Sequence, residues 1–265
     1  AIFSVFLSFI AFLNKKNPAN KSLSLLLVLV SIWSLFYGFE LLCDNYNLLH
    51  DLLSIQYIGI SAIPVLLLVF VSRYSERDHW INKRNLLILM IIPVITFIMV
   101  VTNDLHHLFY ATSELIRKGD FSYHEFSKGP FYFLHLIYSY SIILFAIYLI
   151  FNTFLSVSHE NRMRVLFILF SAVIPCIFSL FYIFGFKPEG NIDLTPVGFL
   201  MMGLLLTVGT FNKGLLNIKP IVLSSIYKSI PDAILVVDTN GIVISSNPKA
   251  IEMMQKGLLD DEKIQ

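Results

Sequence analysis

Long apolar runs separated by short polar segments dominate the hydrophobic pattern of this chain. The runs lie at roughly 1–13, 22–43, 52–72, 86–102, 131–155, 163–186 and 194–211. A hydrocarbon core about 30 Å thick needs roughly 20 apolar residues in a helix, because each residue rises about 1.5 Å. Every run except the first approaches this length. We therefore expect an all-α polytopic membrane protein, a seven-transmembrane-helix bundle whose first helix is truncated.

The composition supports the membrane assignment. The 265 residues are 56% hydrophobic and only 14% charged, with a mean hydropathy of +0.74, whereas a soluble domain carries roughly a quarter charged residues. A net charge of +1 gives no reason to expect nucleic acid as a partner. The expected principal partner is the lipid bilayer.

Basic residues gather on alternate loops of the predicted bundle. One set of loops carries Lys15, Lys16, Lys21, Arg73, Arg77, Lys83, Arg84, Arg162, Arg164, Lys213, Lys219 and Lys228, and the other carries Arg117, Lys118, Lys128 and Lys187. Cytoplasmic loops carry the excess of Lys and Arg. The pattern predicts a multi-pass protein of the plasma membrane with its N-terminus outside and its C-terminus in the cytoplasm.

The longest loop, residues 103–130, lies on the predicted outer side and is rich in aromatic residues. We predict a lid with a strand or a short helix, in which Asn103 and His106 are candidate functional residues. Asp104, His106 and His107 are of the types that bind zinc. Adjacent histidines rarely both reach one ion and no further spaced ligand follows, so we expect no metal site.

Polar side chains within or beside the apolar runs concentrate near the predicted outer ends of the helices. They are Glu40, Gln56, His135, Tyr138 and Asp193. Ionisable groups at membrane depth are costly, and this cost suggests a function. Two interpretations are open: the five residues line one ligand pocket, or they are helix caps and interface residues, as Asp193 and Thr195 before Pro196 would be.

A connector helix is predicted over 213–229, after the last apolar run. Pro220 suits the first turn of a helix, and Leu223, Tyr227 and Ile230 recur every three or four residues. This spacing is close to that of a coiled-coil seam. Pro220, Leu223 and Tyr227 are therefore candidate signal-relay residues, and the short seam predicts a weak association into a homodimer that strengthens in the full-length protein.

The tail over 230–265 has the pattern of a soluble α/β segment. The runs AILVVD and IVISSN flank Asn240 and Gly241, and an Asn-Gly pair between two β-rich runs is the strongest short signal for a hairpin. Asn247 and Pro248 are typical of the cap and the first position of a helix. A hairpin and one helix are too short to bury a core, so we expect an incomplete domain.

Several stretches resemble known families. The tail IPDAILVVDTNGIVISSNPKAIEMM resembles the opening of a PAS domain, in which a strand ending in Asp, a Gly turn, a second strand and an Asn-capped helix follow one another. The stretches QYIGISAIPVLLLVF, TNDLHHLFY, GPFYFLHLIYSY and DLTPVGFLMMGLLLTVGTFNKGLLNIKPI are similar to the N-terminal seven-transmembrane sensor region of bacterial and archaeal histidine kinases.

This resemblance implies a domain order and a function. A seven-helix sensor over 1–212, the connector over 213–229 and the start of a PAS domain over 230–265 would detect an extracellular or membrane-borne signal, carried by a small ligand or peptide. They would relay it to a cytoplasmic histidine kinase and its response regulator. The chain contains no phosphoacceptor-His helix and no ATP-binding boxes, so we expect no catalytic residue and no cofactor in it. ATP and Mg are expected only for the kinase part.

Alternatives to the kinase sensor stay open. The same type of sensor also precedes diguanylate cyclases. A small permease or transporter shares the hydrophobic pattern, although transporters concentrate polar groups near the midplane of the membrane. A retinal protein would need a Schiff-base lysine in the last helix, and residues 194–211 contain no lysine.

Overall fold

The computed structural model describes residues 1–13, 18–118, 121–157, 159–185, 192–213, 229–237 and 243–256. The chain forms two compact units, Ala1–Asn217 and Ile218–Gln265. The predicted relay residues Pro220, Leu223 and Tyr227 lie outside the described residues. The connector helix and its coiled-coil seam therefore stay predictions.

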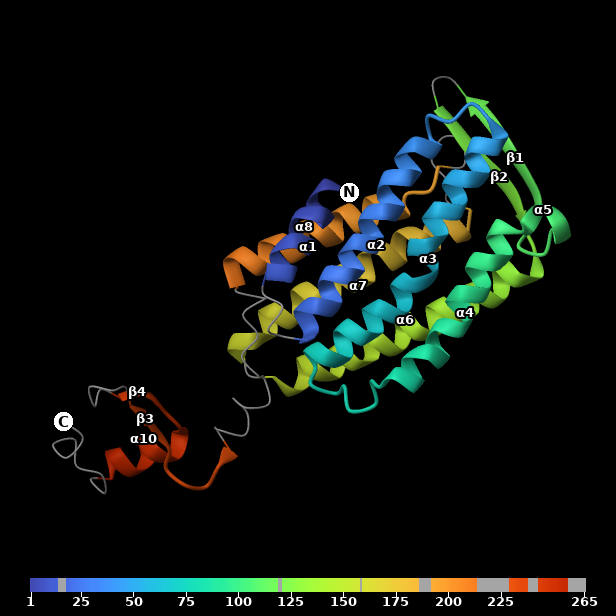
Figure 1. Cartoon of the computed structure of the whole chain (residues 1–265). Helices are drawn as coiled ribbons and strands as arrows, with labels where there is room; N and C mark the ends of the chain where they lie inside the picture. The colour runs from blue at the N-terminus through green and yellow to red at the C-terminus, as the bar shows by residue number, and fades with distance from the viewer. Residues whose placement is uncertain are drawn as a thin grey trace. The chain divides into compact units, whose positions relative to one another are not determined.

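The first unit is a helical bundle with an antiparallel hairpin at one end (Figure 1). Its elements are α1 (Ile2–Leu13), α2 (Pro18–Glu40), α3 (Tyr46–Tyr74), α4 (Lys83–Val101), α5 (Asn103–His106), β1 (Tyr110–Lys118), β2 (Phe121–Lys128), α6 (Pro130–Ser156), α7 (His159–Ile183) and α8 (Thr195–Lys213). Each predicted apolar run forms one helix. We call the end that carries β1 and β2 the hairpin end.

Five helices are long and apolar enough to cross a membrane. They are α2, α3, α4, α6 and the segment Asn161–Ile183 of α7. The apolar segments Ile2–Leu13 and Thr195–Leu206 are shorter within the described residues. The structure is thus a helical membrane domain, while the count of seven spans stays a prediction.

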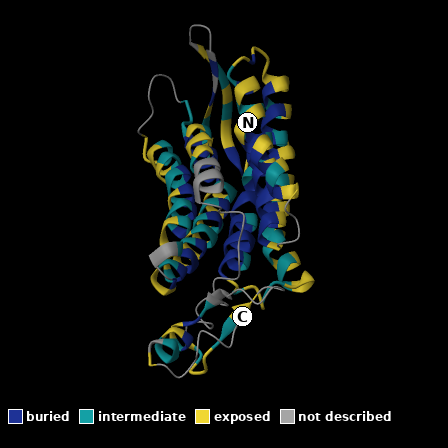
Figure 2. Cartoon of the chain, turned by 90° about the vertical axis from the view of Figure 1, so that its left-hand side faces the viewer, coloured by how far each residue is buried: buried dark blue, intermediate teal, exposed yellow. Residues whose placement is uncertain are grey.

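Helix α3 lies at the centre of the bundle and α4 at its edge. In the most apolar part of each helix, 72% of the α3 residues are buried but only 17% of the α4 residues. Figure 2 shows buried positions in dark blue on the inner faces of the helices and exposed positions in yellow on their outer faces. The exposed side chains of α4 include Leu87, Ile91 and Ile98. Such a surface suits lipid and not water.

Two glycines allow neighbouring helices to approach closely. A methyl group added at Gly59 of α3 would lie 2.7 Å from the Leu29 carbonyl oxygen of α2. One added at Gly198 of α8 would lie 2.8 Å from the Cα of Pro175 in α7. Small residues drive helix association in membranes because they permit such backbone contact. The pairs α2–α3 and α7–α8 are therefore the closely packed pairs of the bundle.

The hairpin forms where a strand or short helix was predicted, and α5 and both strands are present. Register pairs Glu114 with Glu125 and Leu115 with His124. The backbone N–H of Ser122 donates to the Leu41 carbonyl at 2.9 Å, which ties β2 to the turn after α2. A two-stranded hairpin is marginal by itself in water, so these ties position it.

The second unit contains β3 (Leu235–Val237), β4 (Val243–Ser246) and α10 (Pro248–Gln255). The strands pair antiparallel, as predicted, with the predicted turn outside the described residues. The Asn247 side chain accepts from the N–H of Ala250 at 2.9 Å, which confirms the predicted helix cap. The same side chain accepts from Ile234 N and donates to the Asp232 carbonyl. Assignment of this unit to a PAS domain stays a prediction.

Candidate functional site

A cavity of about 190 Å³ lies inside the first unit, among α2, α3, α6, α7, α8 and the hairpin. Aromatic side chains form a large part of its wall, namely Trp33, Tyr37, Tyr57, Tyr110, Phe126, Tyr132, Tyr140, Tyr182 and Phe199. Polar groups interrupt this wall at Glu40, Gln56, His124, His135, Ser139, Ser179, Asp193 and Thr195. An apolar cavity with a few convergent polar groups is typical of a ligand site.

Glu40 and Gln56 form a buried pair in the cavity wall. Glu40 ends α2 and Gln56 lies in the third turn of α3, and the two residues are only 5% and 2% exposed. The Gln56 amide Nε2 donates to Glu40 Oε2 at 2.6 Å. Burying a carboxyl without such a donor is costly, so this hydrogen bond explains how α2 and α3 hold an acid inside the bundle.

Asp193 connects the start of α8 to α2. Its Oδ1 accepts from the Thr195 backbone N–H at 2.8 Å and from the Thr195 hydroxyl at 2.5 Å. Its own backbone N–H donates to the Tyr37 hydroxyl at 2.8 Å. The two interpretations of Asp193 are thus compatible in the structure, because the residue stabilises the start of α8 and also lines the cavity.

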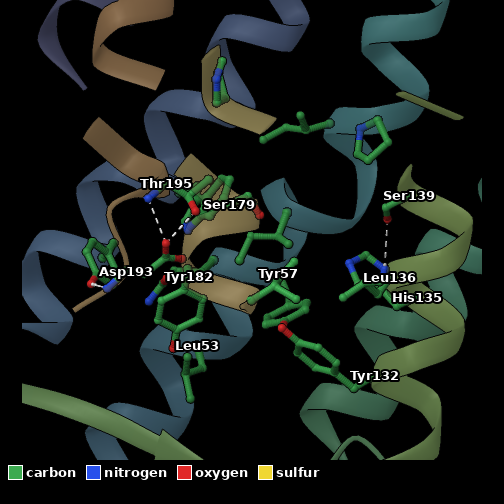
Figure 3. Close-up of a pocket in the computed structure, with 18 of the residues that line it drawn as sticks. Leu53, Tyr57, Tyr132, His135, Leu136, Ser139, Ser179, Tyr182, Asp193 and Thr195 are labelled. Carbon is green, nitrogen blue, oxygen red and sulfur yellow. Dashed lines mark hydrogen bonds between the residues drawn. The ribbon is translucent and has the colours of Figure 1, made fainter. Parts of the chain in front are cut away.

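His135 reaches the cavity from α6. Its Nδ1 lies 3.3 Å from Thr96 Oγ1 and 3.4 Å from Ser139 Oγ. In the view of Figure 3, His135 and Ser139 lie on one side of the cavity and Asp193 and Thr195 on the other. The ring of Tyr57 lies between these groups in that view.

The hairpin supplies three lining residues that were not among the predicted pocket residues, although the loop was predicted to form a lid: Tyr110, His124 and Phe126. The Tyr110 hydroxyl donates to the Tyr57 hydroxyl at 2.9 Å, and the rings of Tyr110 and Phe126 lie 4.6 Å apart. Burial lowers the pKa of His124 to about 4. His124 and Phe126 alternate along β2 and so share one face, and this alternation was the available signal.

Tyr138 does not line the cavity, although the sequence grouped it with the pocket residues. Its hydroxyl donates to the Leu89 carbonyl of α4. Pro93 lies four residues after Leu89 and has no N–H to pair with that carbonyl. Tyr138 supplies the missing donor. The structure therefore brings Glu40, Gln56, His135 and Asp193 together and places Tyr138 at the α4–α6 contact.

Asn103 and His106 also lie away from the cavity and organise the turn before β1. Asn103 Oδ1 accepts from the backbone N–H groups of Phe109 and Tyr110, and its Nδ2 donates to the Tyr110 carbonyl. His106 Nδ1 accepts from Leu108 N at 2.9 Å. The Asn103 bonds orient Tyr110, a residue of the cavity wall, whereas His106 holds the turn at Leu108. Neither Asn103 nor His106 lines the cavity.

Comparison with known proteins yields a family match. The sequence model described as the N-terminal 7TM region of histidine kinase matches residues 1–220, a range that contains every residue of the cavity wall. No curated protein and no solved structure matches the chain.

Proposed function

Because the chain belongs to the family of N-terminal 7TM regions of histidine kinases and is a multi-pass membrane protein, we propose that it is the sensor module of a two-component signalling protein. The cavity at the hairpin end is the site at which the signal acts. The observation that carries this proposal is the convergence of Glu40, Gln56, His135 and Asp193 on one aromatic-walled cavity. Ionisable groups placed inside a membrane bundle indicate function.

The route of the signal runs through α7 and α8. Pro175 of α7 and Phe199 of α8 line the cavity, and Gly198 contacts Pro175. An occupant of the cavity that fits one packing of these helices better than another shifts the equilibrium between the two. Helix α8 leads towards residues 213–229, the predicted connector, and so passes the change in helix packing on to it.

The finer features of the module belong to the same proposal. Seven helices span the plasma membrane, the hairpin end faces outside, and the C-terminus lies in the cytoplasm. The connector leads into a PAS domain and a homodimeric histidine kinase, whose own part binds ATP and Mg and phosphorylates a response regulator. The distribution of Lys and Arg among the loops supports the orientation.

Filling the cavity tests the proposal. Ser139→Trp in the intact parent protein places an indole in the cavity, and we expect its output to stay at one level across growth conditions that change the output of the wild type. Ser141→Trp is the matched control, because Ser141 lies on the same helix and is exposed. The measurement is a response-regulator reporter, with membrane levels determined by immunoblot.

A second variant guards against loss of folding. Glu40→Gln keeps the shape of the side chain and an oxygen that accepts from Gln56, and it should change the response while the membrane level stays constant. A normal range of response in both Ser139→Trp and Glu40→Gln would contradict the proposed site.

A further inference from the structure

The charge of the cavity wall is one-sided. Glu40 and Asp193 are acids, and no Lys or Arg occurs among the described residues that line the cavity. His124 is neutral at pH 7, since burial lowers its pKa to about 4. An ammonium group of the described residues lies outside the lining, where Lys128 Nζ lies 5.6 Å from the centre of the Tyr132 ring. The charged groups of the described lining itself are therefore acids.

The two acids lie at the same region of the wall. Tyr37 precedes Glu40 by three residues on α2, and residues with this spacing are neighbours on a helix surface. The Tyr37 hydroxyl accepts from the backbone N–H of Asp193. Glu40 itself is 5% exposed, accepts from the neutral Gln56 amide, and forms no ion pair in the described part of the chain. A buried acid of this kind either takes up a proton or is held ionised by a neighbouring cation, so an ammonium group beside Glu40 would stabilise its ionised form.

The rest of the wall suits the same class of ligand. Tyrosine and tryptophan rings present negative faces, which attract ammonium groups. Figure 3 shows Tyr57, Tyr132 and Tyr182 among the side chains around the cavity. Trp33 also lines it, in edge-to-face contact with Phe199 at 5.0 Å between ring centroids.

We propose that the cavity binds a small organic cation, with its ammonium group beside Glu40 and Asp193 and its apolar part against the aromatic wall. This inference rests on the proposed function and names the ligand class of that site. The size of the cavity agrees with such a ligand. Its volume is about 190 Å³, and an engineered cavity of about 150 Å³ in another protein holds benzene. A benzene ring with one aminomethyl group is therefore a suitable probe.

The test compares three monosubstituted benzenes of similar size: benzylamine, benzyl alcohol and benzoate. The chain contains two tryptophans, Trp33 and Trp80, so Trp80→Phe leaves Trp33 as a fluorescent reporter in the cavity. We expect benzylamine to change Trp33 fluorescence and raise Tm in maltoside micelles. Glu40→Gln should raise the benzylamine Kd about tenfold, the equivalent of about 1.4 kcal/mol, and leave binding of benzyl alcohol unchanged.

Asp51→Asn is the control for charge alone, since Asp51 is exposed on α3 and does not line the cavity. It should leave the benzylamine Kd unchanged. Equal binding of benzoate and benzylamine, or an equal loss of affinity in Asp51→Asn and Glu40→Gln, overturns the cation inference while the sensor site stands. Failure of all three probes also overturns it, and the Ser139→Trp response then decides the proposed function separately.

A free amine and a lipid headgroup share this chemistry, and a second titration distinguishes them. The same measurement is made in vesicles with a fixed share of phosphatidylglycerol, in which the remaining lipid is either an uncharged glycolipid or phosphatidylethanolamine, so that the surface charge stays constant. A higher apparent Kd for benzylamine with phosphatidylethanolamine supports the headgroup as occupant. An unchanged Kd supports a free amine.

Discussion

The hydroxyl of Tyr138 compensates for a proline on another helix. Pro93 leaves the Leu89 carbonyl without its helical donor, and Tyr138 donates to that carbonyl from α6. In hydrocarbon no water can take this place, so the carbonyl needs a donor from the protein. A proline inside a lipid-exposed helix is thus tolerated because one phenol reaches it.

Tyr138→Phe should lower the free energy of unfolding by about 1 kcal/mol, in the range measured for hydrogen bonds inside membrane proteins. The expected ligand affinity is that of the wild type, because Tyr138 lies outside the cavity. Tyr148→Phe is the control, since Tyr148 on the same helix is 58% exposed. Denaturation in mixed micelles measures both variants, and equal stabilities would contradict the role given to Tyr138.

His124 makes the hairpin sensitive to acid. Its pKa is about 4 in the folded chain because of burial, and about 6.5 in an unfolded one. Between these values the unfolded hairpin binds more protons, so its stability falls as the pH falls from about 6.5 to 4, by up to about 3 kcal/mol. Above pH 6.5 the stability should not change through this residue.

Hydrogen exchange of the β1 and β2 amides, expressed as protection factors, measures this effect. Protection should be lower at pH 5 than at pH 7 in the wild type and nearly equal in His124→Gln, whose amide still reaches Ser113, the partner of His124 Nε2 at 2.8 Å. If protection depended on pH in the same way in both proteins, a titratable group other than His124 would be its cause.

At the scale of elements, the α7–α8 pair combines a kink-prone residue with a backbone contact. Pro175 interrupts the hydrogen bonding of α7, and Gly198 packs against it. Both helices also supply cavity residues. The contact therefore couples the shape of the cavity to the position of the last helix.

Gly198→Ala should lower the free energy of unfolding by about 1–3 kcal/mol, as overpacking typically does, and shift the basal output of the parent protein. A methyl group at this position meets backbone that cannot rotate away. Gly203→Ala on the same helix is the control, because its nearest neighbours lie 3.7 Å away and alanine favours helix over glycine. Equal melting temperatures for the two variants would show that the contact between Gly198 and Pro175 leaves no less room for a methyl group than Gly203 has.

At the scale of the whole molecule, the helices were predictable and their neighbours were not. The length of the apolar runs alone identifies α2, α3, α4, α6 and α7. In lipid each span must pair its own backbone N–H and C=O groups, and a helix does so. Helix α4 is apolar all round, so no stripe indicates which face meets α3. His135 and Tyr138 lie three residues apart on α6, and only the packing decides that one faces the cavity and the other α4.

The polar helix residues of the site were predictable from the sequence, and the hairpin residues were not. Glu40, Gln56, His135 and Asp193 were conspicuous because polar groups are rare in apolar runs. Tyr110, His124 and Phe126 reach the cavity through contacts distant in sequence, such as the Tyr110–Tyr57 hydrogen bond and the Ser122–Leu41 bond. The alternation of His124 and Phe126 along β2 indicates that they share a face, but no local pattern specifies which helices that face meets.

The predicted orientation can be measured directly in cells. A reporter fused after Lys213 should lie in the cytoplasm, and a reporter inserted near Gly119 should lie outside the cell. The reason is that loops with an excess of Lys and Arg stay on the cytoplasmic side. Alkaline phosphatase and green fluorescent protein give opposite signals on the two sides. Reversed activities would place the cavity at the cytoplasmic face.

The cavity wall begins at Trp33 and ends at Phe199, so synthesis of the chain completes the wall only after most of the helices have been made. A nascent chain that has been synthesised only as far as α7 has most of its helices. It still lacks the part of the wall that Thr195 and Phe199 provide. A compound that fits the cavity cannot guide the early helices into the membrane. It can act only on chains synthesised beyond Phe199, so a rise in yield during expression would come from steps that follow insertion of the early helices.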